Sequence, residues 1–206
     1  MKQSTAFSWD KFLDPNSLRS NLIAASIFIT SYEILKDSII EQIKSFYTHG
    51  FDQNGPIVSE SYRAKVLDLD SKGNHFRASI AWLRANGVID AKDEQMIGEL
   101  TRHRNDVAHN LPQFLSEAGR EVELGRLTNL IAVVAKVDRW WIMNVELAIQ
   151  DEINPDDVHA DGIVSGRLFF LHMLLTTASG AESSQIYEEF LKQRDLFDKS
   201  TKGSQA

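Results

Sequence analysis

The chain has 206 residues and no cysteine; 43% of the residues are hydrophobic, 25% are charged, and the formal net charge is −7. The length suffices for one large domain or two small ones with a buried core, and the lack of cysteine excludes disulfides, thiolate zinc sites and cysteine nucleophiles. The acidic balance excludes a protein that coats nucleic acid nonspecifically, because such binding depends on neutralising phosphate. It remains compatible with a small local basic site.

Neither a signal peptide nor a membrane span is expected. The N-terminus lacks the apolar run of a secretory signal. The most apolar segments, 22–30 and 130–137, are far shorter than the roughly 20 residues that a membrane-spanning helix needs. We therefore expect a soluble, cytoplasmic protein without membrane contacts.

The first part of the chain predicts one long helix. Residues 1–16 are expected to be an irregular lead-in, and Asn16 or Ser17 can cap the helix that follows. From Leu18 to Tyr47, apolar side chains recur every three or four residues, as in an amphipathic helix. The inward positions are Leu22, Ala25, Ile29, Tyr32, Leu35, Ile39, Ile43 and Phe46. Aromatic residues expected to pin the lead-in are Phe7, Trp9 and Phe12. Turn-forming residues then predict a loop: Gly50, Asn54, Gly55 and Pro56.

Shorter helices follow in the middle of the chain. They are predicted at about 59–69, at about 74–85 and from Asp90 onwards. Gly87 ends the second of these as a glycine C-cap. Asp90 and Asp93 give the third a start that resembles a capping box. The inward positions of this third helix are Met96, Ile97 and Leu100.

The rest of the chain also predicts helices. One starts at Ser116 or Glu117, reaches as far as Ala148 and carries an apolar stripe at helical spacing. That stripe consists of Leu124, Leu127, Ile131, Val134, Val137 and Trp141. Two further helices are predicted at 165–177 and 182–197.

These elements together predict an all-α protein, because no segment shows strand alternation of convincing length. We expect an up-and-down helical bundle with additional C-terminal helices. The expected organisation is a lead-in at 1–16, a helical bundle at 17–150, a C-terminal extension packed on the bundle at 151–197 and a disordered tail at 198–206.

Chemistry gathers in one segment, Thr101-Arg102-His103-Arg104-Asn105-Asp106-Val107-Ala108-His109-Asn110. A histidine can exchange a proton near neutral pH. An arginine can hold a phosphate through two parallel hydrogen bonds and stabilise the charge that develops on it. Together the two groups suffice to cleave RNA without a metal, the histidine acting on the ribose 2'-hydroxyl or the leaving oxygen and the arginine on the phosphorane. The products would be a 2',3'-cyclic phosphate and a 5'-hydroxyl.

Helical geometry sets a condition on such a site. At 100° per residue, Asn105 and His109 lie about 40° apart on one stripe and Arg102 nearly eclipses His109, whereas Arg104 lies about 140° from His109. Arg104 and His109 can serve one site if the helix ends before His109, as the nearby Pro112 suggests, or if a second subunit completes the site.

The run Arg104-Asn105-Asp106-Val107-Ala108-His109 resembles the motif of HEPN domains (higher eukaryotes and prokaryotes nucleotide-binding). That motif is an arginine followed by a polar residue, often asparagine, and then a histidine after a total of four to six residues. The resemblance covers roughly residues 18–150, including a long first helix, the segment 81–89 and an acid-capped helix before the motif. It implies an all-α bundle of about five helices.

The resemblance also implies a function. Active HEPN proteins are metal-independent endoribonucleases of defence, toxin–antitoxin or RNA-processing systems, and their sites commonly form across a homodimer. Carried over to this chain, Arg104 would bind the phosphate, Asn105 would be its polar neighbour and His109 would be the catalytic histidine. Arg102 and His103 lie outside the core pattern and are expected as weaker RNA contacts. No metal or cofactor is implied.

Two other interpretations stay open. The cluster could be structural, with its polar groups capping carbonyls and forming surface ion pairs. Alternatively, the fold could serve as a non-catalytic interaction or dimerisation module that partners a nucleotidyltransferase or another defence protein, and an antitoxin could mask an active site.

Two further features favour structure over chemistry. The acids and histidine at 156–161 follow Asn154-Pro155, which is typical of a helix start, so we expect no metal site there. Of the adjacent Trp140 and Trp141, one is expected in the core and the other at a helix or subunit contact.

Overall fold

A computed structural model describes residues 8–123, 125–149 and 164–178. Within these residues it contains eight α-helices that pack together and one two-stranded hairpin, which confirms the all-α prediction apart from the hairpin. The helices are α1 Trp9–Leu13, α2 Pro15–Phe46, α3 Glu60–Lys65, α4 His75–Ala85, α5 Ala91–His109, α6 Leu111–Ser116, α7 Gly125–Trp141 and α8 Gly166–Ala178. The strands are β1 Thr48–Asp52 and β2 Gly55–Val58, and the short helical turns are η1 Leu67–Leu69, η2 Ile142–Glu146 and η3 Leu147–Ile149.

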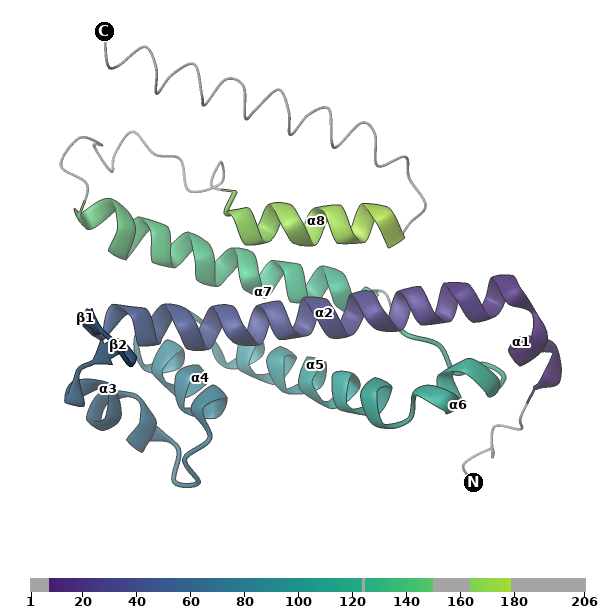
Figure 1. The fold of residues 1–206 in the computed structure, drawn as a ribbon, viewed down its shortest axis with the longest axis horizontal. Helices are drawn as coiled ribbons and strands as arrows, with labels where there is room; N and C mark the ends of the chain where they lie inside the picture. The colour runs from purple at the N-terminus through teal and green to yellow at the C-terminus, as the bar shows by residue number, and fades with distance from the viewer. Residues whose placement is uncertain (1–7, 124, 150–163, 179–206) are drawn as a thin grey trace, which may run out of the picture.

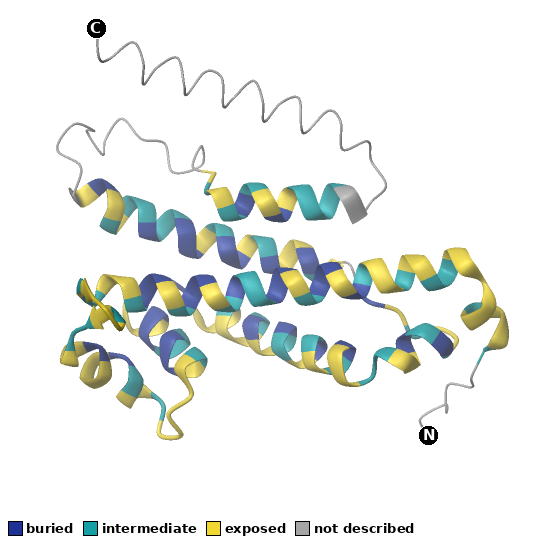
Figure 2. Cartoon of the chain, viewed as in Figure 1, coloured by how far each residue is buried: buried dark blue, intermediate teal, exposed yellow. Residues whose placement is uncertain are grey.

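The long helix α2 is the centre of the molecule. It packs against α4 and α5 on one side and against α7 and α8 on the other (Figure 1). The buried residues follow the contacts between these helices, while α1 and the start of α2 are mostly exposed (Figure 2). The largest fully buried side chains are Phe28, Leu35, Ile39, Ile43, Leu83, Ile97, Leu100, Leu127, Leu130, Leu171, Val66 and Val107. No helix in the described part of the chain is both long and apolar enough to span a membrane.

The boundaries of α2 differ from the prediction. The Asp14 carboxylate, rather than Asn16 or Ser17, caps the helix, and Pro15 occupies its first turn, where the missing N–H is not needed. Between Ala25 and Ile43 the predicted inward positions are buried, except Ile29, which is partly buried. The two outer positions of this apolar stripe, Leu22 and Phe46, are 40% and 53% exposed.

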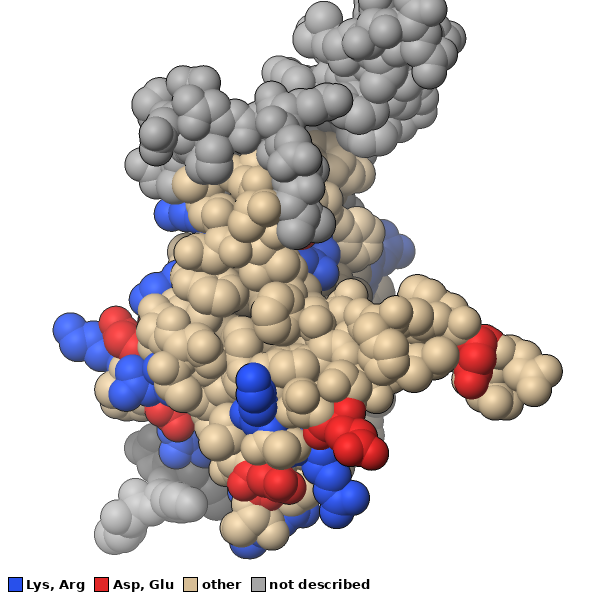
Figure 3. Space-filling view, turned by 90° about the vertical axis from the view of Figure 1, so that its left-hand side faces the viewer, with Lys and Arg blue, Asp and Glu red and all other residues tan. Residues whose placement is uncertain are grey.

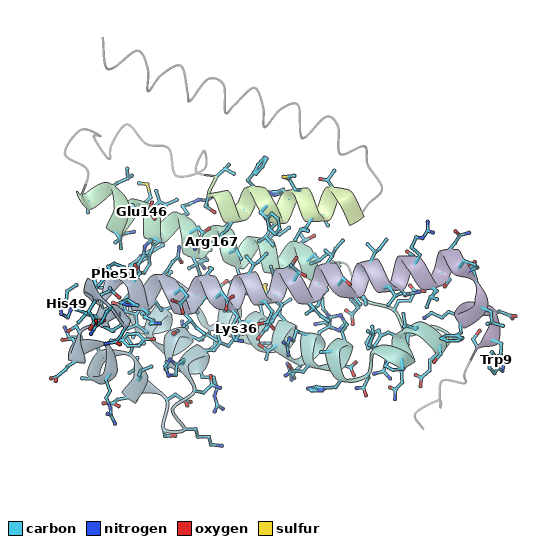
Figure 4. All side chains as sticks on the ribbon, in the orientation of Figure 1. Trp9, Lys36, His49, Phe51, Glu146 and Arg167 are labelled. Atoms are coloured by element: carbon cyan, nitrogen blue, oxygen red, sulfur yellow. The ribbon has the colours of Figure 1, made fainter. Side chains whose placement is uncertain are left out.

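The predicted loop after α2 is a β-hairpin. The antiparallel register pairs Gly50 with Ile57 and Asp52 with Gly55. The Asn54 N–H donates to the Asp52 carboxylate at 2.7 Å, and Gly55 takes a φ of 117°, which favours glycine. The strands have too few alternating apolar residues to be recognised in the sequence. They place Phe51 and His49 at the opposite end of the molecule from Trp9 (Figure 4).

The start of the motif helix is as predicted. Asn74 caps α4, Gly87 lies beyond its end with a φ of 69°, and Asp90 and Asp93 form a complete capping box at the start of α5. The predicted inward residues Ile97 and Leu100 are fully buried, and Met96 is partly buried. Local sequence signals thus fix where α5 begins and which face it buries.

The chain after α5 differs from the prediction. Ser116 and Glu117 do not begin a long helix; they end the short helix α6, which carries Pro112 in its first turn. The long helix α7 begins only at Gly125, and its α-helical part ends at Trp141. Trp141 is buried as expected for one of the two tryptophans, and Trp140 packs its ring against Trp82 at 6.2 Å.

The lead-in is not irregular, since it contains α1. Polar contacts fasten it to the end of α6: the Ser8 N–H donates to the Ser116 carbonyl at 2.7 Å. The Lys11 ammonium donates to the carbonyls of Glu117 and Arg120 at 3.0 and 2.6 Å. The expectations for Phe7, Leu124, the acidic segment 156–161, the helix at 182–197 and the tail at 198–206 lie outside the described residues.

A buried acid joins α8 to the bundle. Asp138 of α7 is 1% exposed, and it accepts hydrogen bonds from Gln42 of α2 at 3.1 Å, from the Ser165 hydroxyl, and from Arg167 of α8 at 2.9 Å. In Figure 4, Arg167 lies between α7 and α8. Because a buried carboxylate is costly unless it is paired, this cluster fixes how α8 sits on α7.

Candidate functional site

The helix that carries the motif is continuous to its last residue. α5 extends to His109, and the Asn110 N–H closes its last turn by donating to the Asp106 carbonyl at 2.9 Å. The side chains of Asn110 and Asp106 also bond, at 2.7 Å. The expected early end of the helix before His109 is therefore wrong: Pro112 starts the next helix instead of breaking this one.

Arg104 is held on the side of α5 that faces α2. Its guanidinium forms an ion pair with the Glu33 carboxylate of α2 and donates to the Asn105 side-chain oxygen at 3.2 Å. The guanidinium carbon also lies 5.8 Å from the centre of the Tyr32 ring, within the range of a cation–π contact. With 28% of the side chain exposed, Arg104 is fixed in position and still reaches solvent.

Glu33 is itself clamped between two cations. Its second oxygen lies 3.2 Å from the Lys36 ammonium, and Figure 4 shows Lys36 on the part of α2 that runs beside α5. Hydrogen bonds from Lys36 and Arg104 outweigh the effect of partial burial and hold the pKa of Glu33 below its usual value. Glu33 therefore stays ionised and keeps the Arg104 guanidinium oriented.

The other expected site residues lie on the outward face of α5. Arg102, Asn105 and His109 are all exposed, and they share one stripe of the helix, as their spacing predicted. Arg102 forms no ion pair with any described residue. Asn105 links the two groups, since it shares a stripe with His109 and accepts the hydrogen bond from Arg104. Within this chain, however, Arg104 and His109 project from different sides of the helix.

His103 differs from its neighbours because it faces the core. It is 9% exposed, and its ring meets the edges of Phe28 and Phe114 with centroids 4.8 and 6.3 Å away. Burial, together with the nearby Arg126, lowers the pKa of His103 below 6.5, so the imidazole is neutral at pH 7. Arg102 and His103, both expected as weaker RNA contacts, line one cleft, but Arg102 is exposed whereas His103 is buried.

The buried imidazole makes stability depend on pH. Because the pKa of His103 is lower in the folded than in the unfolded protein, the unfolded chain binds more protons as the pH falls. This contribution is fully present above pH 6.5 and is lost as the pH falls through the lowered pKa of the folded state. Urea unfolding at pH 7.5 and 5.5 should show a loss of stability in the wild type that is smaller in His103→Phe. An equal loss in both proteins would assign the effect to other groups.

The residues that hold the motif from other elements were not predicted from the sequence. Glu33 and Tyr32 lie on α2, and Arg120 lies beyond α6, where it pairs with Asp106 at 2.7 Å and stacks over the Phe114 ring at 4.7 Å. The only signal for Tyr32 was its place in the apolar stripe of α2, and no signal singled out Glu33 or Arg120.

At the hairpin end of the molecule, basic and acidic side chains are interspersed on the surface (Figure 3). Among the described residues, no group of three His, Asp or Glu side chains is placed to hold a metal ion.

Comparison with known proteins identifies no relative: no protein-family model, no curated protein and no solved structure matches the chain.

Proposed function

We propose that this protein is a metal-independent endoribonuclease of the HEPN type, acting as a homodimer in a defence or toxin–antitoxin setting. RNA is its substrate. His109 acts as general acid or base, Arg104 binds and stabilises the phosphoryl group, and Asn105 orients Arg104. The proposal needs neither a metal nor a cofactor.

The observation that supports this proposal best is the arrangement of the motif on α5. Asn105 and His109 are exposed on its outward face, and Arg104 beside them is fixed by Glu33 and Asn105 rather than left mobile. Fixed donors aimed at developing charge contribute more to catalysis than mobile ones, because they need no reorganisation during the reaction.

The continuous helix determines how such a site is completed. Since α5 does not unwind before His109, Arg104 and His109 of one subunit project about 140° apart. In the proposed dimer, two copies of α5 meet across a two-fold axis, with His109 of one subunit next to Arg104 of the other. An isologous interface repeats every contact, so the dimer has two such sites. The homodimer is therefore part of the proposed site.

In the proposed reaction, His109 removes the proton from the ribose 2'-hydroxyl, which attacks the adjacent phosphorus. The bond from phosphorus to the 5'-oxygen breaks, and that oxygen takes up a proton from water, to which His109 afterwards releases the proton that it removed. Arg104 donates hydrogen bonds to the non-bridging oxygens as negative charge builds up on them. The products are a 2',3'-cyclic phosphate and a 5'-hydroxyl.

The direct test is cleavage of single-stranded RNA by the purified full-length protein in the presence of EDTA, with analysis of the new ends. We expect cleavage without added metal, 2',3'-cyclic phosphate ends and a dimer in solution. Cleavage that EDTA abolishes, or new 3'-hydroxyl ends, would contradict the proposed mechanism.

Glu33 provides a second test, because it positions Arg104 without contacting the substrate. Glu33→Ala should lower the cleavage rate by about 10-fold or more, since a small displacement of a catalytic group is costly. Glu33→Gln keeps a hydrogen-bond acceptor and should retain more activity. The rates are measured on the same RNA, with Asp37→Ala as the control, since Asp37 is an exposed acid one helical turn away on α2. Equal rates for Glu33→Ala and the control would remove Glu33 from the site.

One observation favours a second function. The Arg104 guanidinium already has two partners, Glu33 and Asn105, as expected if the cluster stabilises the fold. In that case the protein is a non-catalytic interaction module, with a nucleotidyltransferase or another defence protein as its partner. It would leave RNA intact, and its expression would not arrest growth, whereas an active toxin would arrest growth unless His109 were replaced.

A further inference from the structure

A polar cleft lies next to the proposed cleavage site, between α5 and the start of α7. Its volume is about 460 Å³, within the range of sites that bind small ligands. One wall is a single stripe of α5 made of Glu99, His103 and Asp106, which are spaced four and three residues apart. Arg102, Glu123 and Arg126 complete the lining. Because Arg102 also belongs to the outward face with Asn105 and His109, the cleft borders directly on the motif.

Most charges in the cleft already have partners. Asp106 pairs with Arg120, and both oxygens of Glu123 accept hydrogen bonds from Arg126 at 2.8 and 3.1 Å. Two charges are left without a counterion among the described residues, the Arg102 cation and the Glu99 carboxylate, which accepts one hydrogen bond from Gln95. The cleft is therefore close to neutral and offers one cation and one anion to a ligand.

The imidazole of His103 adds an unused hydrogen-bonding group. The side chain is nine-tenths buried and lines the cleft, yet its Nε2 atom has no partner in the described part of the chain. Buried polar atoms are nearly always hydrogen-bonded, so an unpartnered one calls for an explanation. The atom itself is closed to water, so a ligand in the cleft would supply the missing hydrogen bond once the imidazole turns toward it.

We propose that this cleft binds a guanine base of the RNA, next to the phosphate that is cleaved. The carboxylate of Glu99 accepts hydrogen bonds from N1–H and the N2 amino group of guanine, which is the base that presents two adjacent donors on one edge. His103 bonds to the base from the buried side of the cleft, and Arg102 holds the neighbouring phosphate. The inference rests on the proposed ribonuclease function, since that function supplies the RNA chain that enters the cleft.

Binding can be tested separately from cleavage. The full-length His109→Ala protein is titrated into fluorescent RNA heptamers that carry G, A, C or U between two uridine triplets, and anisotropy gives the dissociation constants. We expect the guanine heptamer to bind about 10-fold more tightly than the adenine heptamer, as is usual for one good bidentate contact to a base. Equal binding of all four heptamers would overturn the proposal, even if the wild-type protein cleaves RNA.

Variants of the cleft then locate the preference. In the His109→Ala protein, the further substitution Glu99→Gln exchanges one acceptor for a donor. It should reduce the preference for the guanine heptamer to about 2-fold or less. Adding Glu60→Gln, an exposed residue on α3, should leave the preference unchanged. His103→Phe removes the buried nitrogen while keeping a ring between Phe28 and Phe114, and it should also abolish the preference. A guanine preference that survives both Glu99→Gln and His103→Phe would place the base elsewhere.

Two further measurements distinguish failure of the proposed ribonuclease activity from failure of the proposed base-binding cleft. If the wild-type protein does not cleave RNA but the guanine preference depends on Glu99, the proposed activity fails and the cleft is supported. Guanosine 5'-monophosphate serves as competitor for the heptamer. If it competes as strongly as the unlabelled guanine heptamer, the cleft takes a free nucleotide, and an RNA ligand is overturned.

Discussion

Replacing His109 by alanine is expected to lower RNA cleavage by about 100-fold or more, because general acid–base catalysis by one side chain contributes at least that factor. Arg104→Ala is expected to have an effect of similar or greater size, since it removes the donors that stabilise the phosphoryl charge. Cleavage rates are measured with one labelled RNA in EDTA. His49→Ala and Arg63→Ala are matched controls, because both residues are exposed and lie far from the motif on β1 and α3.

Mixing the two inactive proteins tests whether the site is shared between subunits. In a dimer made of one Arg104→Ala and one His109→Ala subunit, one of the two shared sites keeps both groups. Half of the dimers are mixed after exchange and each has one intact site, so about a quarter of the wild-type rate should return. No recovery, in a mixture shown to contain mixed dimers, would mean that each site lies within one subunit. Full activity in both single variants would refute the assignment of the site.

Replacing Arg167 by alanine is expected to destabilise the fold by about 3–5 kcal/mol, since it leaves a buried carboxylate without its cation. Asp138 is 1% exposed, so water cannot take over the role of the guanidinium. The free energy of unfolding is measured with urea at pH 7.5. Arg63→Ala, which removes an exposed arginine, should change it by less than about 0.5 kcal/mol.

The double variant Asp138→Asn/Arg167→Ala separates the charge from the packing. It removes the buried charge and leaves an amide that can still accept a hydrogen bond from Gln42. Its stability should therefore be clearly higher than that of Arg167→Ala alone, because neighbouring substitutions in one polar cluster are not additive. If the losses simply add, Arg167 stabilises α8 through its aliphatic stem and not through its charge.

The parts of the fold that depend on local signals could be predicted from the sequence. The helix starts at Asn74 and Asp90, the C-cap at Gly87 and the burial of Ile97 and Leu100 each depend on residues a few positions apart. Boundaries near proline were predicted less well. Pro15 and Pro112 lie within first turns, where proline is tolerated, so the helices begin earlier than the following apolar stripes indicate.

The surroundings of the motif depend on distant residues and could not be predicted in this way. Arg104 meets Glu33 from a position 71 residues away, and neither side chain stands out in its own segment. His103 is a different case, because its spacing from Leu100 and Val107 already indicates an inward position. Its polar identity concealed this signal, since histidines are usually found nearer the surface than leucines.

Hydrogen bonds from Ser8 and Lys11 clasp α1 to the end of α6. This clasp has a consequence for the order in which the parts of the molecule fold. Lys11 bonds to carbonyls that follow it by 106 and 109 residues. Contacts over such separations form late, because closing a long loop costs more entropy than forming a helix. During synthesis, the clasp cannot close until residue 120 has been made, and Arg120 also holds Asp106 beside the motif. A ribosome-bound chain that ends before this point already contains Glu33 and Tyr32, which hold Arg104, but it lacks Arg120. The end of α5 therefore acquires its final surroundings only after the clasp has closed.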